Sequence, residues 1–222
     1  MRIYIKLRSN GTIVPFTHQP QLVGAIHKWI GRENKEHGRI SFFSFSQIKG
    51  GKKQDNGLKF TNPSFYISVW DPELAETIIK GICQSPEVCY GLRVTDVQII
   101  SCPDMSHESL FCCDSPILIK SNSEERKYPE FLKYDNPKCG VILKSQILKK
   151  MEYAGLEPDP GLEIKLLPTE KAKIKLIDYR GVKNIANDCT IYMKGKPETL
   201  RFIWDTGLGS STGIGFGAIS KL

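Results

Sequence analysis

Histidine is the side chain best suited to acid–base chemistry near neutral pH. This chain of 222 residues contains four histidines, at positions 18, 27, 37 and 107. The helical spacing of Leu22, Ile26, Trp29 and Ile30 puts His27 roughly 110° from the centre of their apolar stripe, at its edge. His37 lies in the polar segment 32–39, with basic residues on either side. The His27 ring could therefore face a cleft and transfer protons, although each histidine taken alone is more simply explained as a packed or solvated side chain.

Positive charge is concentrated near the start of the chain. The formal net charge is +7 and the pI is about 9.0, which suits a polyanionic partner. Residues 1–60 hold 11 basic and 3 acidic side chains, whereas residues 61–222 hold 20 and 21. The basic excess is therefore local, and it surrounds His27 and His37 in the sequence.

A run of five glycines in eleven residues lies near the C-terminus, from Gly207 to Gly217. Glycines permit positive φ and close approach, and successive amides in such turns can bind an anion such as a phosphate. Packing or a flexible hairpin would explain the same glycines. A nucleophile elbow would require a histidine after Ser211, and none follows His107. The glycine spacing of this run also differs from that of the dinucleotide-binding fingerprint and from that of the Walker motif. The candidate binding residues of this run are Gly207, Gly209, Ser210, Ser211, Gly213, Gly215 and Gly217.

Three lysines alternate with apolar residues at Lys171, Lys173 and Lys175. Alternate residues of a strand share one face and repeat at roughly 6.6 Å, which is comparable with the phosphate spacing of an extended nucleic acid. These lysines are candidate RNA ligands. A solvated face, or lysines that protect an edge strand, would produce the same pattern.

Cysteine and histidine usage argues against a metal site and a disulfide framework. The seven cysteines are scattered, with no CxxC pair and no histidines at zinc-ligand spacing. The N-terminal segment alternates charged with apolar residues, and no stretch approaches the ~18 apolar residues of a membrane span. We therefore expect a reduced, cytoplasmic protein without a metal, a cofactor or a membrane partner.

The periodicity predicts two similar halves, each containing strands and helices. In the first half, alternation or helical spacing predicts strands at 2–8, 42–45, 65–70 and 92–100 and helices at 19–31 and 71–83. Residues 49–57 are expected to form a mobile loop. This β-α-β-β-α-β order is the ferredoxin-like plan. In the second half the predicted strands are 111–119, 171–177, 189–193 and 214–219, with helices at 139–153 and 197–204, and 162–167 is a strand candidate without an assigned place. We predict an α+β protein of two tandem ferredoxin-like (RRM-like) domains, 1–105 and 106–222.

The combination of these motifs with the predicted order of elements resembles the CRISPR-associated endoribonucleases of the Cas6 type, which process precursor CRISPR RNA. The resemblance covers most of the chain and is most specific at the closing glycine loop. Its other components are the basic first strand, the helix 22–30 with the histidine-containing connection into 41–46, and the helix start at 71–73. It implies two ferredoxin-like domains and metal-independent cleavage of repeat RNA. In that reaction the 2′-OH attacks the adjacent phosphate and leaves a 2′,3′-cyclic phosphate and a 5′-OH.

The resemblance also implies roles for individual residues. His37 becomes the general base, His27 the general acid or a positioning group, and Arg39 or Lys52 the cation that stabilises the phosphorane. Ser41 stands where a lysine is expected, so Arg39 is the substitute. Serines and a threonine occupy the glycine loop where relatives often have a basic residue. The loop would therefore hold RNA through amides and hydroxyls.

The implied partner is CRISPR repeat RNA, possibly with other subunits of a CRISPR effector complex or further copies of the chain. One alternative is a subunit of the same architecture that binds repeat or guide RNA without cutting it. A second alternative is a single-strand-binding module that uses the outward face of the first strand, Arg2, Tyr4, Lys6 and Arg8, as an RNA platform.

Overall fold

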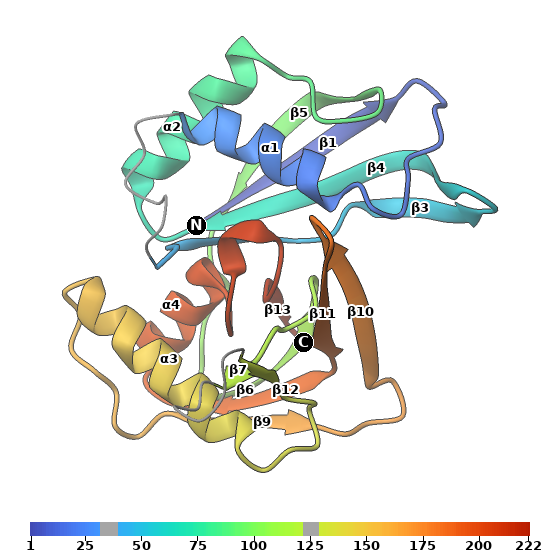
Figure 1. The fold of residues 1–222 in the computed structure, drawn as a ribbon. Coiled ribbons are helices and arrows are strands. Elements are labelled where there is room, and N and C mark those ends of the chain that lie inside the picture. The colour runs from blue at the N-terminus through green and yellow to red at the C-terminus, as the bar shows by residue number, and fades with distance from the viewer. Residues whose placement is uncertain (32–39, 122–128) are drawn as a thin grey trace.

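The computed structural model describes residues 1–31, 40–121 and 129–222. In the first half, one antiparallel sheet has the strand order β2-β4-β1-β5, and β3 pairs with an extension of β4. Two helices, α1 and α2, cover one face of this sheet (Figure 1). The elements are β1 (Arg2–Ser9), α1 (Gln19–Ile30), β2 (Phe43–Phe45), β3 (Lys49–Gln54), β4 (Gly57–Val69), α2 (Pro72–Gln84) and β5 (Leu92–Ile100).

Local sequence explains most of these elements. The apolar residues of β1, Ile3, Ile5 and Leu7, are buried under the helices, as the alternation predicts. At the start of α2 the Asp71 carboxylate accepts a hydrogen bond of 2.9 Å from the Glu73 amide, and Pro72 follows the cap. The predicted strand and helix order of the first half is therefore confirmed.

The second half repeats the plan. Its sheet has the order β13-β6-β12-β9, which is the order of the first sheet when the four strands of each half are numbered along the chain. Its elements are β6 (Glu108–Cys113), α3 (Cys139–Tyr153), β9 (Glu163–Leu167), β12 (Thr190–Lys194), α4 (Pro197–Thr206) and β13 (Ile219–Lys221). Two further strand pairs lie outside this sheet: β7 (Lys120–Ser121) with β8 (Glu130–Phe131), and β10 (Lys173–Tyr179) with β11 (Val182–Asp188). The tandem ferredoxin-like fold is confirmed, while the division at residue 105 stays a prediction.

Several predicted segments differ from the structure because contacts with residues distant in the sequence determine their conformation. Residues 49–54, expected in a loop, pair with β4 as β3. The unassigned candidate 162–167 becomes the edge strand β9. The strand expected at 111–119 ends at Cys113 because Pro116 and Leu118 bond the glycine loop, accepting from the amides of Gly217 and Ser210 at 2.9 and 2.8 Å. The final strand consequently begins at Ile219 instead of residue 214.

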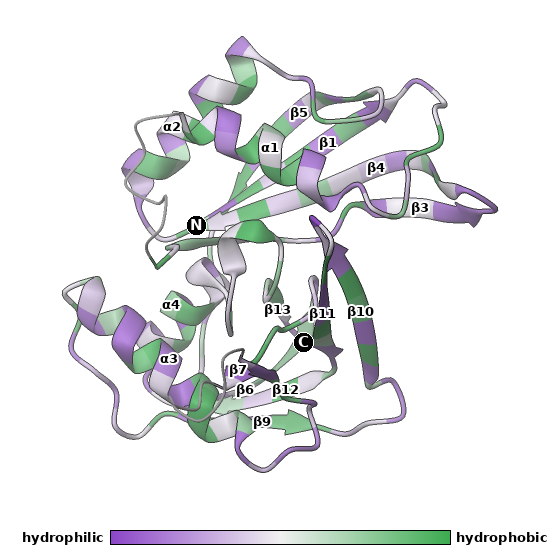
Figure 2. Cartoon of the chain, in the orientation of Figure 1, coloured by the Kyte–Doolittle hydropathy of each residue, from purple (hydrophilic) through white to green (hydrophobic). Residues whose placement is uncertain are grey.

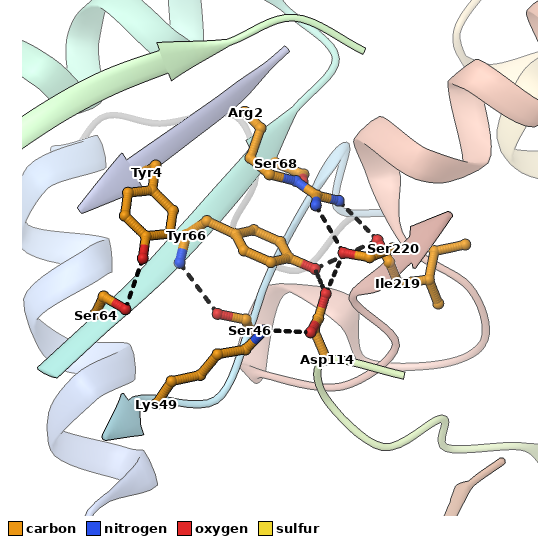
Figure 3. A network of polar contacts seen from close by, with 10 residues as sticks. All are labelled: Arg2, Tyr4, Ser46, Lys49, Ser64, Tyr66, Ser68, Asp114, Ile219 and Ser220. Carbon is orange, nitrogen blue, oxygen red and sulfur yellow. Dashed lines mark hydrogen bonds and ion pairs between the residues drawn. The ribbon is translucent and has the colours of Figure 1, made fainter. Parts of the chain in front are cut away.

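The two halves meet around the side chain of Arg2. This side chain is buried, and its guanidinium donates to Ser68 Oγ (2.8 Å), Ser220 Oγ (3.0 Å) and Ile219 O (2.7 Å) (Figure 3). The same group stacks between the rings of Tyr66 and Trp204, 3.7 and 3.9 Å from their centroids. The outward face of β1 therefore packs against the second half at Arg2, which cannot belong to an RNA platform, whereas Lys6 and Arg8 on the same face are exposed.

Asp114 forms a second link between the halves beside Arg2. Its carboxylate accepts from Tyr66 (2.7 Å) and from Ser220, and it pairs with the Lys49 ammonium at 2.7 Å (Figure 3). Burial acts to raise the pKa of Asp114, but the hydrogen bonds from Lys49, Ser220 and Tyr66 outweigh burial and hold that pKa below its ordinary value.

Replacing Arg2 with alanine should destabilise the protein strongly. The change leaves buried acceptors from both halves without a donor, so we expect the free energy of unfolding to fall by about 3 kcal/mol. Urea denaturation measures this. Arg8→Ala, at an exposed arginine of the same strand, is the matched control and should change stability by less than about 0.5 kcal/mol. Equal losses for the two variants would contradict the role of Arg2.

Stability should also depend on pH through Asp114. Because its folded pKa is lowered, its contribution is complete above the unfolded value of about 3.9 and is lost as pH falls through the folded pKa. Asp114→Asn should therefore be less stable than the wild type at pH 7, with a difference that shrinks toward pH 3. Urea denaturation across this range checks it, with Asp104→Asn at an exposed aspartate as the control. A constant difference would contradict the assignment.

Candidate functional site

His27 lies near the end of α1, where it meets the glycine loop. The side chain is half-buried, and its Nε2 is 3.3 Å from the carbonyl oxygen of Gly213. The imidazole packs edge-on against Phe43 of β2, with ring centroids 6.1 Å apart. The orientation of this histidine is thus determined by a strand of the first half and a loop of the second.

Most glycines of the loop are required by packing. Gly207, Gly213, Gly215 and Gly217 are buried. A Cβ on Gly213 would lie 2.4 Å from Ser41 Oγ, and one on Gly217 would lie 1.9 Å from the Leu208 carbonyl oxygen. Gly217 also has φ of +71°, which side chains rarely adopt. Of the two interpretations that the sequence left open, packing explains these four glycines.

The part of the loop that solvent reaches lies between them. Gly209, Ser210 and Ser211 are half-exposed, and Ser211 is in the left-handed region with φ of +63°. The Ser210 hydroxyl accepts from Gln146 Nε2 (3.2 Å), and the Ser211 hydroxyl accepts from Lys120 Nζ (3.5 Å). These side chains bind the loop to α3 and to β7.

A pocket of about 440 Å³ opens at this exposed part of the loop. Residues that line it are Ile40, Ser41, Gln146, Lys149, Lys150, Gly209, Ser210, Ser211 and Thr212. Lys149 is exposed, whereas Lys150 is buried and donates to the Thr206 carbonyl oxygen at 2.8 Å. Burial lowers the pKa of nearby Lys120. This cationic pocket is lined by hydroxyls, an amide and two ammonium groups, so it suits an anion such as a phosphate.

Sequence reasoning missed the contribution of α3 and Lys120. The helix at 139–153 was predicted with its observed bounds, but only its apolar stripe was interpreted. The adjacent Lys149 and Lys150 indicated a basic position beside the apolar stripe of this helix. Nothing in the sequence indicated that this helix would face the glycine loop.

Two of the predicted catalytic residues lie outside the described part of the chain. His37 and Arg39 belong to the segment 32–39. The residues that follow it, Ile40 and Ser41, line the pocket.

Lys52 is not brought to the pocket. It is exposed on β3, opposite Lys59 of β4, close to the turn that joins these strands. The two strands extend to one side as a hairpin (Figure 1). Among the described residues that line the pocket, none comes from this hairpin. The structure therefore places Lys52 on a separate hairpin, and its role as the phosphate-stabilising cation stays a prediction.

The predicted lysine row is divided between a turn and a strand. Lys171 lies in the turn before β10, and Lys173 and Lys175 lie on β10, where Lys175 pairs with Asp188 at 2.7 Å. Hydrophobic and hydrophilic residues alternate along β10 (Figure 2). The apolar face is partly solvated, with Ile174 40% and Leu176 63% exposed. The row therefore belongs to a separate hairpin, and its RNA contacts stay a prediction.

The described residues contain neither a metal-binding cluster nor a membrane-spanning helix. No group of three or more histidine, cysteine or acidic side chains in residues 1–31, 40–121 and 129–222 is arranged to hold a metal ion. No helix in these same ranges is long and apolar enough to cross a membrane.

Comparison with known proteins supplies the remaining observations. Residues 100–220 match the family described as CRISPR associated protein Cas6, C-terminal. The chain is 25% identical to the putative CRISPR-associated endoribonuclease-like protein Cas6 of Pyrococcus furiosus over 99% of this chain and 98% of the relative. It is 22% identical to the CRISPR-associated endoribonuclease Cas6 1 of Methanocaldococcus jannaschii, over 99% and 92%. A solved structure described as "An RAMP protein binding different RNA substrates" superimposes with a TM-score of 0.88 at 23% identity, covering 100% of this chain and 99% of that one.

The packing of Gly213 can be tested directly. Gly213→Ala should force the loop away from Ser41, so we expect the free energy of unfolding to fall by about 1–3 kcal/mol. Gly24→Ala is the control, since a Cβ at this helical glycine meets nothing within 4 Å, and it should be neutral or stabilising by up to about 1 kcal/mol. Urea denaturation compares the two. A Gly213→Ala variant as stable as the wild type would show that the loop is not held by this contact.

Proposed function

This chain belongs to the Cas6 family of CRISPR-associated proteins, and we propose that it is an endoribonuclease that binds CRISPR repeat RNA and cleaves it. The observation that carries the proposal is the position of His27, held by Gly213 at the same loop that lines the cationic pocket. Relatives named as CRISPR-associated endoribonucleases support it, as does the full-length similarity to them. The similarity in fold to a protein that binds RNA substrates is consistent with it.

We propose the metal-independent reaction in which the ribose 2′-oxygen attacks the adjacent phosphorus. The P–O5′ bond breaks, the 2′-OH proton passes to a base, and an acid protonates the leaving 5′-oxygen. Products are a 2′,3′-cyclic phosphate and a 5′-OH. His27 fits the acid, because a ring N–H that is 3.3 Å from its carbonyl acceptor is held weakly and can be donated to another oxygen. In this proposal His37 is the base and Arg39 stabilises the phosphorane.

The RNA backbone would be bound mainly by residues of the second half. The amides and hydroxyls of Gly209, Ser210 and Ser211, with Lys149 and Lys120, would hold a phosphate in the pocket. Gly207, Gly213, Gly215 and Gly217 would act by positioning this segment, since they are buried. Lys171, Lys173 and Lys175 would contact RNA further along. Other effector subunits, or further copies of this chain, are proposed partners that bind beyond the site.

A second candidate is a subunit that binds repeat or guide RNA without cutting it. The half-buried ring of His27, packed on Phe43 and directed at the Gly213 carbonyl, also fits a histidine that only positions the loop. One relative is named a Cas6nc endoribonuclease-like protein. The two candidates share the RNA pocket and differ in whether His27 transfers a proton.

Cleavage of a repeat RNA by the purified protein in a metal chelator tests the proposal. His27→Ala should lower the single-turnover rate by at least ~100-fold while affinity for the RNA changes little, because an acid acts only in the reaction. His107→Ala, at an exposed histidine of the other half, is the matched control and should cut at the wild-type rate. Gel electrophoresis of end-labelled RNA measures the rates, and filter binding measures affinity.

Replacing the ribose at the cut site with 2′-deoxyribose should abolish cleavage. Cleavage that survives this change, or that requires magnesium, would contradict the mechanism. Tight repeat binding without any cleavage by the wild type would favour the second candidate.

A further inference from the structure

A second pocket, of about 340 Å³, lies where the start of α1 faces the β10–β11 hairpin. Both halves contribute to it, and Gly215 of the glycine loop forms part of its wall. The short helix 212–214 of the loop therefore separates this pocket from the cationic one. The lining residues are Phe16, Thr17, His18, Gln19, Leu22, Phe45, Ser46, Gln47, Ile48, Leu58, Leu176, Ile177, Asp178 and Gly215.

The chemistry of these walls differs from that of the cationic pocket. Among the described residues that line it, none is lysine or arginine, and Asp178 carries a negative charge, so a phosphate is disfavoured. Phe16 lies at the pocket with 51% of its surface exposed, and Leu176 faces it from the other half with 63% exposed. Two exposed apolar side chains of this size beside one pocket suit a flat, uncharged ligand.

Two polar side chains at the pocket, His18 and Asp178, present acceptors. The Nδ1 of His18 lies 2.8 Å from the Pro15 carbonyl oxygen, so it carries the ring proton and leaves Nε2 as an acceptor. Burial lowers the pKa of His18, which keeps the ring neutral. Asp178 accepts from the Gly181 amide with one carboxylate oxygen and retains a second. Acceptors on a small pocket favour a ligand that carries N–H donors.

Cations flank the pocket without entering it. Lys53 lies directly opposite Leu58 in the β3–β4 pair, and Lys183 lies directly opposite Asp178 in the β10–β11 pair. Directly opposite residues share a face of the sheet, so each exposed lysine lies beside a residue of the pocket wall. An apolar slot with a positive charge on either side matches an unpaired nucleotide, whose base is flat and uncharged and whose neighbouring phosphates are anionic.

We propose that this pocket receives one unpaired, amino-bearing nucleobase of the bound RNA, stacked on Phe16, with its amino group directed to His18 or Asp178. The inference rests on the proposed binding of repeat RNA and adds a base-specific subsite that is separate from the cationic pocket. Lys53 and Lys183 hold the flanking phosphates. The basic hairpin of the first half thereby acquires a role in binding, although it lies away from His27.

A repeat RNA that carries a single abasic site at each nucleotide in turn tests the subsite. Removal of the base at one position should lower the affinity of the wild type for the RNA about tenfold, the size expected for a stacked base. Phe16→Ala should bind intact RNA about tenfold more weakly and become insensitive to base removal at that same position. Tyr153→Ala, at an exposed aromatic residue of α3, should keep the wild-type pattern. Urea denaturation checks that both variants are folded.

The type of base can be tested at the position so identified. Replacing the base with an analogue that lacks the amino group should weaken binding to the wild type but not to the double variant His18→Phe with Asp178→Ala, which lacks both acceptors. Unchanged abasic sensitivity in Phe16→Ala would overturn the subsite while RNA binding, and with it the proposed function, stands. The same result is expected if the pocket takes a side chain of a partner protein instead. A wild type that does not bind repeat RNA at all would overturn both proposals.

Discussion

The structure depends on one buried cation, the guanidinium of Arg2, at the junction of the two ferredoxin-like halves. A planar group with donors on its edge and two faces open to aromatic rings can be buried when every donor has an acceptor. Here Ser68 comes from the first half, and Ser220 and the Ile219 carbonyl come from the second (Figure 3). Part of the sheet face that is free in an isolated ferredoxin-like domain is thereby used for assembly. The two pockets described above lie along the seam between the halves.

The glycine loop of the second half also packs closely against the first half. It crosses from α4 to β13 against β2, and the missing side chains allow backbone to lie where a Cβ would collide with Ser44, Ser41 or Phe45. Because the loop is held in this way, the Gly213 carbonyl reaches His27 on one side, and residues 209–212 line the cationic pocket. The same segment therefore packs against the first half and lines the pocket. The buried glycines position the half-exposed Ser210 and Ser211.

The basic excess of the first sixty residues is used in several different ways. Arg2 is structural, Lys6 and Lys49 pair with Asp96 and Asp114, and Lys52 and Lys53 lie on an exposed hairpin. In the described part of the chain, the ammonium groups at the glycine loop come from the second half, residues 106–222, which holds 18 basic and 15 acidic side chains. A local count of charge therefore indicated a polyanionic partner, but it did not identify the residues of the pocket.

The sequence by itself determined the elements and their order. Alternation and helical spacing predicted β1, α1, α2 and α3 with nearly their observed bounds, because these patterns reflect contacts within a few residues. From that order came the tandem ferredoxin-like fold, and from the motifs came the family. Only the tertiary structure decided which elements cover each face of a strand or helix. Alternation correctly put Arg2 and Ile3 on opposite sides of β1, yet Arg2 is buried against the second half. In the same way, Lys149 and Ser210 line one pocket and Lys52 lies on a separate hairpin, because such proximity is set by long-range packing that no local pattern records.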